Sequence, residues 1–223
     1  MTPNDPHNDA QIFYAGKPLG QSPNAMIMLH GRGSNADNIL SLAPEFERPS
    51  WTYLAPQAAN DTWYPHSFLT PMEQNEPYLS SALQLIQSLL LRLADFDILP
   101  SQTVILGFSQ GACLATEFAA RHAQRLGGIV GLSGGLIGPP GTPRAYPGSL
   151  DKTPTFIGCS NRDAHIPLAR VQETTAVFQK LGADVTERIY PGMGHTINDD
   201  ELAHVTALLD RIATPPTPPK ATK

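Results

Sequence analysis

The chain has 223 residues, 41% of them hydrophobic and 16% charged, which is enough to form the core of one globular domain. A formal net charge of −5 at pH 7 argues against nucleic acid or an anionic membrane surface as the main partner. Because no run of 18 apolar residues is present and the first ten residues lack the features of a signal peptide, we expect a cytoplasmic protein without stable membrane association.

Short apolar segments bounded by Gly, Pro, Asn or Ser are typical of buried β-strands. Six such segments lie at residues 25–30, 51–56, 103–108, 126–133, 153–160 and 184–191. Segments with apolar residues at helical spacing lie at residues 78–93, 112–124, 168–181 and 200–212. Residues 11–16 predict a further edge strand that forms a hairpin with residues 25–30. The alternation predicts an α/β fold, with a mostly parallel central sheet and helices on both faces.

The C-terminal part of the sequence predicts where the domain ends. Asn198 and Glu201 have the spacing of a capping box, which favours the start of a helix. The final segment, TPPTPPKATK at residues 214–223, is too rich in Pro to join a sheet or a helix. With no interior linker or repeat, we expect a single domain over residues 1–213 and a flexible Pro-rich tail over residues 214–223.

The cysteines and the other ligand-type residues give no sign of a metal or a cofactor. Cys113 and Cys159 lie in apolar segments without CxxC spacing, so we expect two buried free thiols in a reducing compartment. His, Asp and Glu residues do not cluster at metal-ligand spacing, and the sequence has no Gly-rich phosphate loop.

Three reactive side chains each follow a predicted strand. Ser109 follows residues 103–108 within a Gly-x-Ser-x-Gly, Asp163 follows residues 153–160, and His195 follows residues 184–191. Carboxyl ends of parallel strands meet at one edge of a sheet, so we expect these side chains to lie together. A lone Gly-x-Ser-x-Gly is weak evidence, but the chain order Ser, Asp, His is the order of this chemistry on the α/β-hydrolase fold.

Each of these residues also has a less specific interpretation. Ser109 alone would be read as the N-cap of the following helix, and His195 as an ordinary loop histidine. Asp163 could be a surface residue, leaving the carboxylate role to Asp151, Asp199 or Asp200. The three motifs in register favour the catalytic interpretation.

The sequence resembles the phospholipase/carboxylesterase family of α/β hydrolases, small cytosolic esterases that include the acyl-protein thioesterases. The motifs that carry the resemblance are LHGRGSNADN (29–38), GFSQGA (107–112), NRDAHIP (161–167) and YPGMGH (190–195). The resemblance extends from about Ala25 to Ile212, which is nearly the whole predicted domain. It implies an α/β-hydrolase fold that needs no cofactor.

The same resemblance implies a role for each motif. Ser109 would be the nucleophile, His195 the base and Asp163 the acid, and the backbone N–H groups of Arg32 and Gln110 would form the oxyanion hole. The Arg32 side chain departs from the apolar residue that related sequences often carry. It would project either into the substrate site or outward into solvent.

An aromatic, Pro-rich segment, residues 59–77, follows a predicted strand at the expected active-site edge. It would be either a packed surface loop or a substrate-binding wall, and we favour the wall because binding sites are mostly apolar and aromatic. The expected wall residues are Trp63, Tyr64 and Phe68, with His165 at the rim.

The other histidines have less specific expected places. His30 is expected to hold the oxyanion loop by a structural hydrogen bond, and His66 to belong to the pocket rim. His7, His122 and His204 are expected on the surface or on helices.

These patterns predict a serine carboxylic-ester hydrolase that acts through an acyl-serine intermediate on small soluble esters with short acyl or aryl groups, or on thioesters. The alternatives are a dienelactone-type lactone hydrolase, a lysophospholipase or acyl-protein thioesterase, and a non-catalytic binding protein on the same fold. Residues 133–153 hold no amphipathic helix, so we expect no large lid. The expected partner is a small-molecule ester, and a homodimer is left open.

Overall fold

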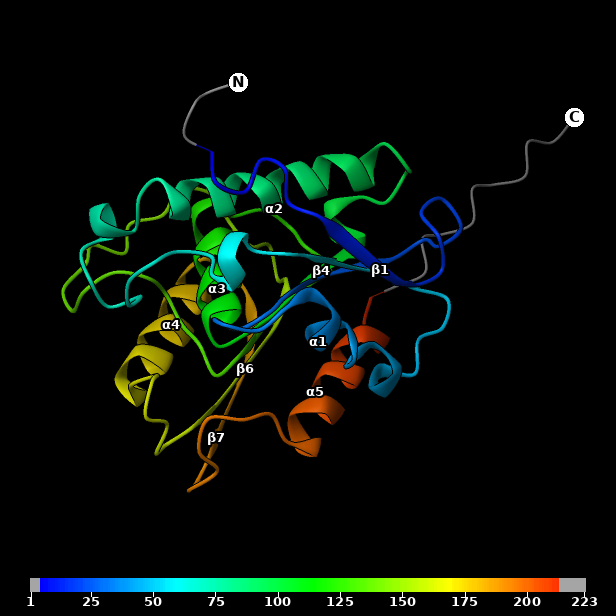
Figure 1. The fold of residues 1–223 in the computed structure, drawn as a ribbon. Helices are drawn as coiled ribbons and strands as arrows, with labels where there is room; N and C mark the ends of the chain where they lie inside the picture. Colours follow the sequence, from blue (N-terminus) through cyan, green and yellow to red (C-terminus); the bar gives the residue numbers. More distant parts are fainter. Residues whose placement is uncertain (1–4, 213–223) are drawn as a thin grey trace, which may run out of the picture.

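A seven-stranded sheet crosses the molecule in this computed structural model, which describes residues 5–212 (Figure 1). The strand order is β1–β3–β2–β4–β5–β6–β7. The strands are β1 (Ile12–Gly16), β2 (Ala25–Leu29), β3 (Thr52–Pro56), β4 (Thr103–Phe108), β5 (Gly128–Leu132), β6 (Pro154–Ser160) and β7 (Asp184–Tyr190). All neighbouring strands are parallel except β1 and β3. The predicted mostly parallel sheet is confirmed.

The predicted hairpin between β1 and β2 is wrong, because β1 pairs antiparallel with β3 instead. Both edges of β2 are occupied by the parallel strands β3 and β4. Every residue of β2 is buried, whereas β1 is half exposed. The fully buried β2 therefore lies inside the sheet, and the half-exposed β1 lies at its edge.

Helices cover both faces of the sheet, as Figure 1 shows. They are α1 (Ala36–Leu40), α2 (Tyr78–Ala94), α3 (Gln110–Arg121), α4 (Leu168–Lys180) and α5 (Asp199–Asp210). α2, α3 and α4 pack on one face, and α1 and α5 pack on the other. Alternate residues of β4 show the division, since Ile105 joins the first core while Val104 and Leu106 join the second.

The connection between β5 and β6 contains no helix and is fastened by buried polar side chains. Glu117 of α3 accepts a hydrogen bond from the Ile137 N–H over 2.9 Å, and Arg144 donates to the Ile137 carbonyl over 2.6 Å. Arg170 of α4 donates to the carbonyl of Leu136. The expectation of a fold without a large lid is confirmed.

Smaller expectations are met in part. Cys113 and Cys159 are free and buried, as predicted. His7 is almost fully buried, so its expected surface place is wrong.

No helix within residues 5–212 is both long and apolar enough to span a bilayer. The predicted flexible tail, residues 214–223, lies outside the described residues.

Glu201 is a fully buried carboxylate in the first turn of α5. The predicted capping box is present: Asn198 accepts from the Glu201 N–H over 2.8 Å, and Glu201 Oε2 accepts from the Asn198 N–H over 3.0 Å. Its Oε1 has no partner among the described residues and lies against Gly158, where an added Cβ would come within 2.2 Å. Burial raises the pKa of Glu201 to about 7, although the Asn198 hydrogen bond opposes the shift.

This raised pKa predicts that Glu201 lowers the stability of the protein as pH rises from about 5 to 8. Over this window the folded protein keeps a proton that the unfolded chain has released, so a higher pH favours unfolding. A shift from 4.5 to about 7 corresponds to roughly 3 kcal/mol in the free energy of unfolding. Glu201→Gln should therefore gain stability over the wild type at pH 8 but not at pH 5, as measured by urea unfolding.

Asp199→Asn is the matched control, because it removes the same charge from an exposed position on the same helix turn. Its difference from wild type should vary little between pH 5 and pH 8. If the free energy of unfolding has the same pH dependence in Glu201→Gln and in the wild type, the raised pKa of Glu201 is contradicted.

Candidate active site

Ser109 stands at a sharp turn between β4 and α3. Its backbone has a φ of 56° and a ψ of −118°, a combination that costs non-glycine residues about 1–3 kcal/mol. Two hydrogen bonds hold the turn: the Ser109 N–H donates to the Leu132 carbonyl over 2.9 Å, and the Ser109 carbonyl accepts from the Cys113 N–H over 3.0 Å. The turn lifts the Ser109 side chain off the end of the strand and away from the sheet.

Two glycines allow α3 to approach the sheet closely at this turn. A Cβ added at Gly107 would lie 2.2 Å from the backbone of Gly111, and one added at Gly111 would lie 2.1 Å from the Leu29 carbonyl oxygen. Real Cβ atoms do not approach backbone this closely, so only glycine fits at either position. The helix N-terminus is consequently fixed directly above the ends of β2 and β4.

The structure brings Ser109, His195 and Asp163 together. The His195 Nε2 lies 2.8 Å from the Ser109 Oγ, and the His195 Nδ1 lies 2.7 Å from the Asp163 Oδ2. None of Asp151, Asp199 and Asp200 forms a hydrogen bond with His195. The three side chains therefore form one hydrogen-bonded chain that ends at the serine hydroxyl.

Asp163 is held as a buried carboxylate by four donors. Besides His195, it accepts from the backbone N–H groups of His165 (2.8 Å) and Ile166 (3.0 Å), and the Cys159 thiol lies 3.8 Å away. Burial alone would raise its pKa, but the hydrogen bonds from His195 and the two backbone groups outweigh it and lower the pKa. An ionised Asp163 accepts from the His195 Nδ1–H, which leaves Nε2 free to accept from Ser109.

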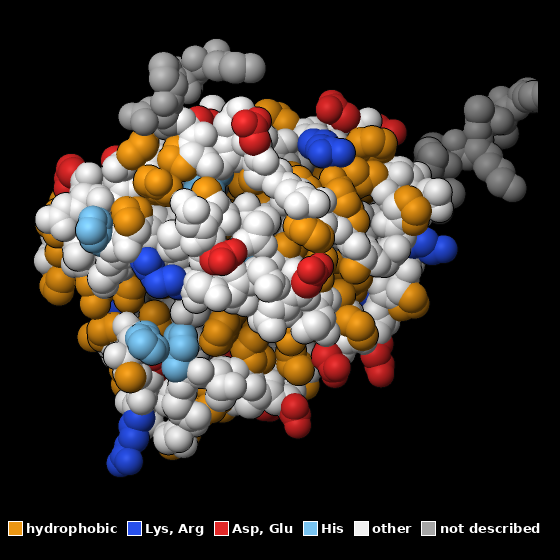
Figure 2. All heavy atoms as spheres, in the orientation of Figure 1, with side chains coloured by type: hydrophobic (Ala, Val, Ile, Leu, Met, Phe, Trp, Pro, Cys, Tyr) orange, Lys and Arg blue, Asp and Glu red, His pale blue; other side chains and the backbone are white. Residues whose placement is uncertain are grey.

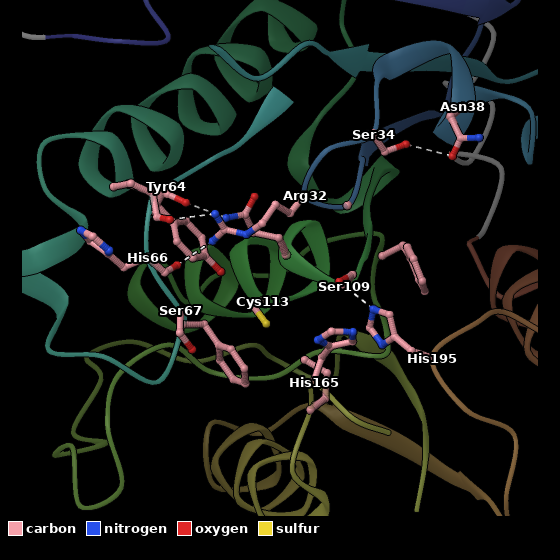
Figure 3. Close-up of a pocket in the computed structure, with 16 residues that line it drawn as sticks. Arg32, Ser34, Asn38, Tyr64, His66, Ser67, Ser109, Cys113, His165 and His195 are labelled. Carbon is pink, nitrogen blue, oxygen red and sulfur yellow. Dashed lines mark hydrogen bonds between the residues drawn. The ribbon is translucent and has the colours of Figure 1, made fainter. Parts of the chain in front are cut away.

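A cavity of about 540 Å³ opens beside Ser109, within the size range of small-molecule sites (Figure 3). Its apolar lining comes from three segments: Tyr64, Pro65 and Phe68 from the first, Phe108 and Cys113 from the second, and Ile166 from the third. His165 lies at its mouth, with its ring centroid 4.7 Å from that of His195, and His66 also lines it. Figure 2 shows two histidine side chains side by side at the surface, next to hydrophobic ones.

Trp63 does not line the cavity, which differs from its expected place in the wall. It is fully buried, and its indole N–H donates to the His30 carbonyl over 2.8 Å. A Trp in an aromatic loop can point into a cavity or into the core. Here the hydrogen-bond partner of the indole N–H lies in the core. Tyr64 and Phe68 do line the cavity, so the segment has both a packed side and a cavity side.

Two buried histidines hold the segment that begins at Ala58. The His30 Nε2 accepts from the Ala58 N–H over 3.1 Å, so its Nδ1 carries the proton and donates to the Gly31 carbonyl over 2.8 Å. The His7 Nδ1 accepts from the Ala59 N–H over 3.1 Å, and its Nε2–H donates to the Trp63 carbonyl over 3.0 Å. Burial lowers the pKa of both rings, which favours these neutral forms.

The side chains of Gln110 and Arg32 hold the same segment from the cavity side. Gln110 accepts from the Trp63 N–H over 3.0 Å and donates to the Tyr64 carbonyl over 2.8 Å. Arg32 donates to the carbonyls of Pro65 (2.8 Å) and His66 (2.6 Å), as the dashed lines in Figure 3 show. Of the two expected placements, the Arg32 side chain therefore has the one in the cavity, where it lies along the wall.

The backbone N–H groups of Arg32 and Gln110 make no hydrogen bond within residues 5–212. Gln110 is the first residue of α3, where the helix dipole favours negative charge. An added Cβ at Gly31 would lie 3.4 Å from the Ser109 Cβ, so the loop that carries Arg32 runs beside the serine. These free donors can stabilise an anion that forms next to the Ser109 Oγ.

Sequence reasoning missed Phe108, Ile166 and the clamp formed by the Gln110 side chain. The signal was available for the first two, because each is close in sequence to a predicted site residue, Ser109 or Asp163. The clamp had no signal, since its partners Trp63 and Tyr64 lie 47 and 46 residues away in the chain. In the described part of the chain, no group of three or more His, Cys, Asp or Glu side chains is arranged to hold a metal ion.

Comparison with known proteins gives concordant matches. A model of the Phospholipase/Carboxylesterase family matches residues 15–212. The crystal structure of a phospholipase/carboxylesterase from Dyadobacter fermentans is similar with a TM-score of 0.85 and 39% identity, and the match covers 91% of this chain and 96% of that chain.

Curated relatives include fungal proteins named acyl-protein thioesterase 1 and rice proteins named probable carboxylesterase. The one from Gibberella zeae is 32% identical over 117 residues, which is 52% of this chain and 50% of its own length. The one from Emericella nidulans is 25% identical over 213 residues, covering 84% of this chain and 89% of the relative. The chain thus spans about half the length of the Gibberella zeae relative in that match, and 56–60% of the length of three further fungal ones.

We predict that Gln110→Ala destabilises the protein by about 1–3 kcal/mol, because it leaves the buried Trp63 N–H without a partner and removes one of the two hydrogen bonds to the Tyr64 carbonyl. Urea unfolding measures the change. Gln84→Ala, on the exposed face of α2, is the matched control and should stay within about 0.5 kcal/mol of wild type. Equal stability of the two variants would show that the clamp contributes nothing.

Proposed function

The chain belongs to the phospholipase/carboxylesterase family of α/β hydrolases, and from this we propose that it is a serine ester hydrolase that acts on small soluble esters through an acyl-serine intermediate. The observation that carries the proposal is the hydrogen-bonded chain from Asp163 through His195 to Ser109, beside a cavity of about 540 Å³. A non-catalytic binding protein would need neither this series of hydrogen bonds nor the strained turn that carries Ser109.

In the proposed reaction the Ser109 Oγ attacks the ester carbonyl carbon while the His195 Nε2 accepts the serine proton. The Asp163 carboxylate holds the imidazole in the required tautomer and stabilises the imidazolium that forms. The imidazolium then donates its proton to the leaving alcohol, which leaves an acyl group on Ser109. In the second half a water molecule attacks the acyl carbon while His195 accepts a proton from the water. The bond between the acyl carbon and the Ser109 Oγ then breaks, the imidazolium returns the proton to the Ser109 Oγ, and the acid is released.

We assign the stabilisation of the tetrahedral oxyanion to the backbone N–H groups of Arg32 and Gln110. Both are free of other hydrogen bonds in residues 5–212, and both flank Ser109. Fixed donors aimed at developing charge are the largest single contribution in many such reactions, about 2.7–4 kcal/mol for one donor.

The cavity supports a preference for short acyl or aryl groups. It is open, and polar side chains, Arg32, Ser34 and Asn38 among them, line it together with the apolar patch formed by Tyr64, Phe68, Phe108 and Ile166. A long acyl chain gains about 0.8 kcal/mol for each buried CH₂ and needs a correspondingly long apolar groove. The names of the fungal relatives favour a second candidate, hydrolysis of an acyl thioester, which would use the same residues and the same steps.

We predict that Ser109→Ala folds normally and loses activity on an activated nitrophenyl ester by at least about 10³-fold, because the attacking oxygen is removed. A fluorophosphonate probe should label the wild type at Ser109 and leave the variant unlabelled. Ser67→Ala is the matched control, because Ser67 also lines the cavity but contacts neither His195 nor Asp163. It should be labelled at Ser109 like the wild type. Near-wild-type turnover by Ser109→Ala would overturn the proposal.

We predict that kcat/KM for nitrophenyl esters is highest for short acyl chains and does not rise further towards sixteen carbons. The physical reason is that we expect the apolar patch beside Ser109 to cover a short group, while a long chain needs a longer apolar groove. The measurement is a series from two to sixteen carbons, together with acyl thioesters of the same lengths. A value that climbs steadily to the longest chain would contradict the short-ester preference and favour a lysophospholipase or acyl-protein thioesterase.

A further inference from the structure

Arg32 provides the only arginine or lysine side chain that lines the cavity, among the described residues. No Asp or Glu side chain of residues 5–212 joins the lining. The protein as a whole carries a formal charge of −5, so the positive side chain in the cavity is opposite in sign to the net charge of the protein. A positive cavity in an acidic protein attracts anions locally.

The Arg32 guanidinium is oriented but not neutralised. It carries five N–H donors, and its two hydrogen bonds to the carbonyls of Pro65 and His66 use two of them. The remaining donors have no protein acceptor in residues 5–212, and no carboxylate lies within ion-pair distance. In contrast, Arg144 and Arg170, in the neighbouring connection and helix, both pair with Glu173.

The orientation of Arg32 is fixed by its neighbours before any ligand binds. Its guanidinium carbon lies 5.9 Å from the centroid of the Tyr64 ring, and the two carbonyl acceptors hold its plane. Figure 3 shows it on the wall of the cavity, away from the Ser109 and His195 side chains. A group of the substrate that meets Arg32 is thus separated from the ester by a spacer.

We propose that Arg32 is a specificity-determining residue that selects esters carrying a carboxylate, placed some atoms away from the scissile bond. The inference rests on the proposed ester hydrolysis and adds the substrate class. A carboxylate fits the fork of donors on a guanidinium and forms charge-assisted hydrogen bonds with it. One such interaction changes binding by about tenfold or more, and salt should weaken it because Arg32 is exposed.

The test compares matched esters that differ only in the charged group. On the acyl side the pairs are the mono-4-nitrophenyl esters of six- and eight-carbon dicarboxylic acids against 4-nitrophenyl hexanoate and octanoate. On the alcohol side the pair is the butyrate ester of 4-hydroxybenzoic acid against that of 4-hydroxybenzamide. The readout is the ratio of kcat/KM for the charged ester to that for its neutral partner, after subtraction of uncatalysed hydrolysis.

The ratio separates charge recognition from the structural contacts of Arg32. Loss of the bonds to Pro65 and His66, or a shift of the loop beside Ser109, would slow both members of a pair. Arg32→Met should lower the ratio about tenfold on at least one side of the ester, and Arg32→Lys should keep much of it because the charge remains. Arg92→Met, which removes the same charge from α2 outside the cavity, should leave the ratio at the wild-type value.

A ratio that is unchanged in Arg32→Met for every pair would overturn the inference, as would an equal fall in Arg92→Met. In both cases the neutral esters would still be hydrolysed, so the proposed ester hydrolysis would stand. If the wild type hydrolyses none of the esters and Ser109 is not labelled by fluorophosphonate, the proposed function itself fails.

Discussion

The steric contact between α3 and the ends of β2 and β4 is the constraint on which the site depends. Gly107 and Gly111 permit an approach that any side chain would block, and this approach fixes the first residue of α3 above the sheet. Ser109 then has to adopt its positive φ, because the chain must turn from strand to helix within one residue. The unfavourable backbone conformation is therefore a consequence of packing, and it presents the hydroxyl at the sheet edge where His195 and Asp163 arrive from β7 and β6.

The wall of the cavity depends on a second set of contacts, which are polar. The segment from Ala58 to His66 has little regular structure, and its backbone groups bond instead to the side chains of His7, His30, Gln110 and Arg32. Buried backbone groups need hydrogen-bond partners, and here these partners are side chains from three separate parts of the chain. The same contacts position Tyr64 at the cavity and Trp63 in the core.

Much of the fold could be predicted, because buried strands and amphipathic helices leave a local pattern. The placement of Ser109, Asp163 and His195 after three strands also followed from such patterns, once the strands were taken as parallel. The partner of β1 could not be predicted, since pairing depends on which strand edges other strands leave open. The burial of Trp63 and His7 could not be predicted either, because an aromatic or imidazole ring suits a core, a cavity wall or a surface equally well on composition alone. The five-residue helix α1 is too short to show a helical period.

The hydrogen bonds that hold the segment from Ala58 to His66 also affect how the protein folds. They join residues that are far apart in the sequence: 28 positions separate His30 from Ala58, and 56 positions separate His7 from Trp63. Contacts of such sequence separation are slow to form, because loop closure has to precede them. No local fragment of the chain can build the wall, so a substrate pocket exists only in molecules that have completed their tertiary structure. Turnover per molecule would then report the fully folded fraction of a preparation more faithfully than its helix content does.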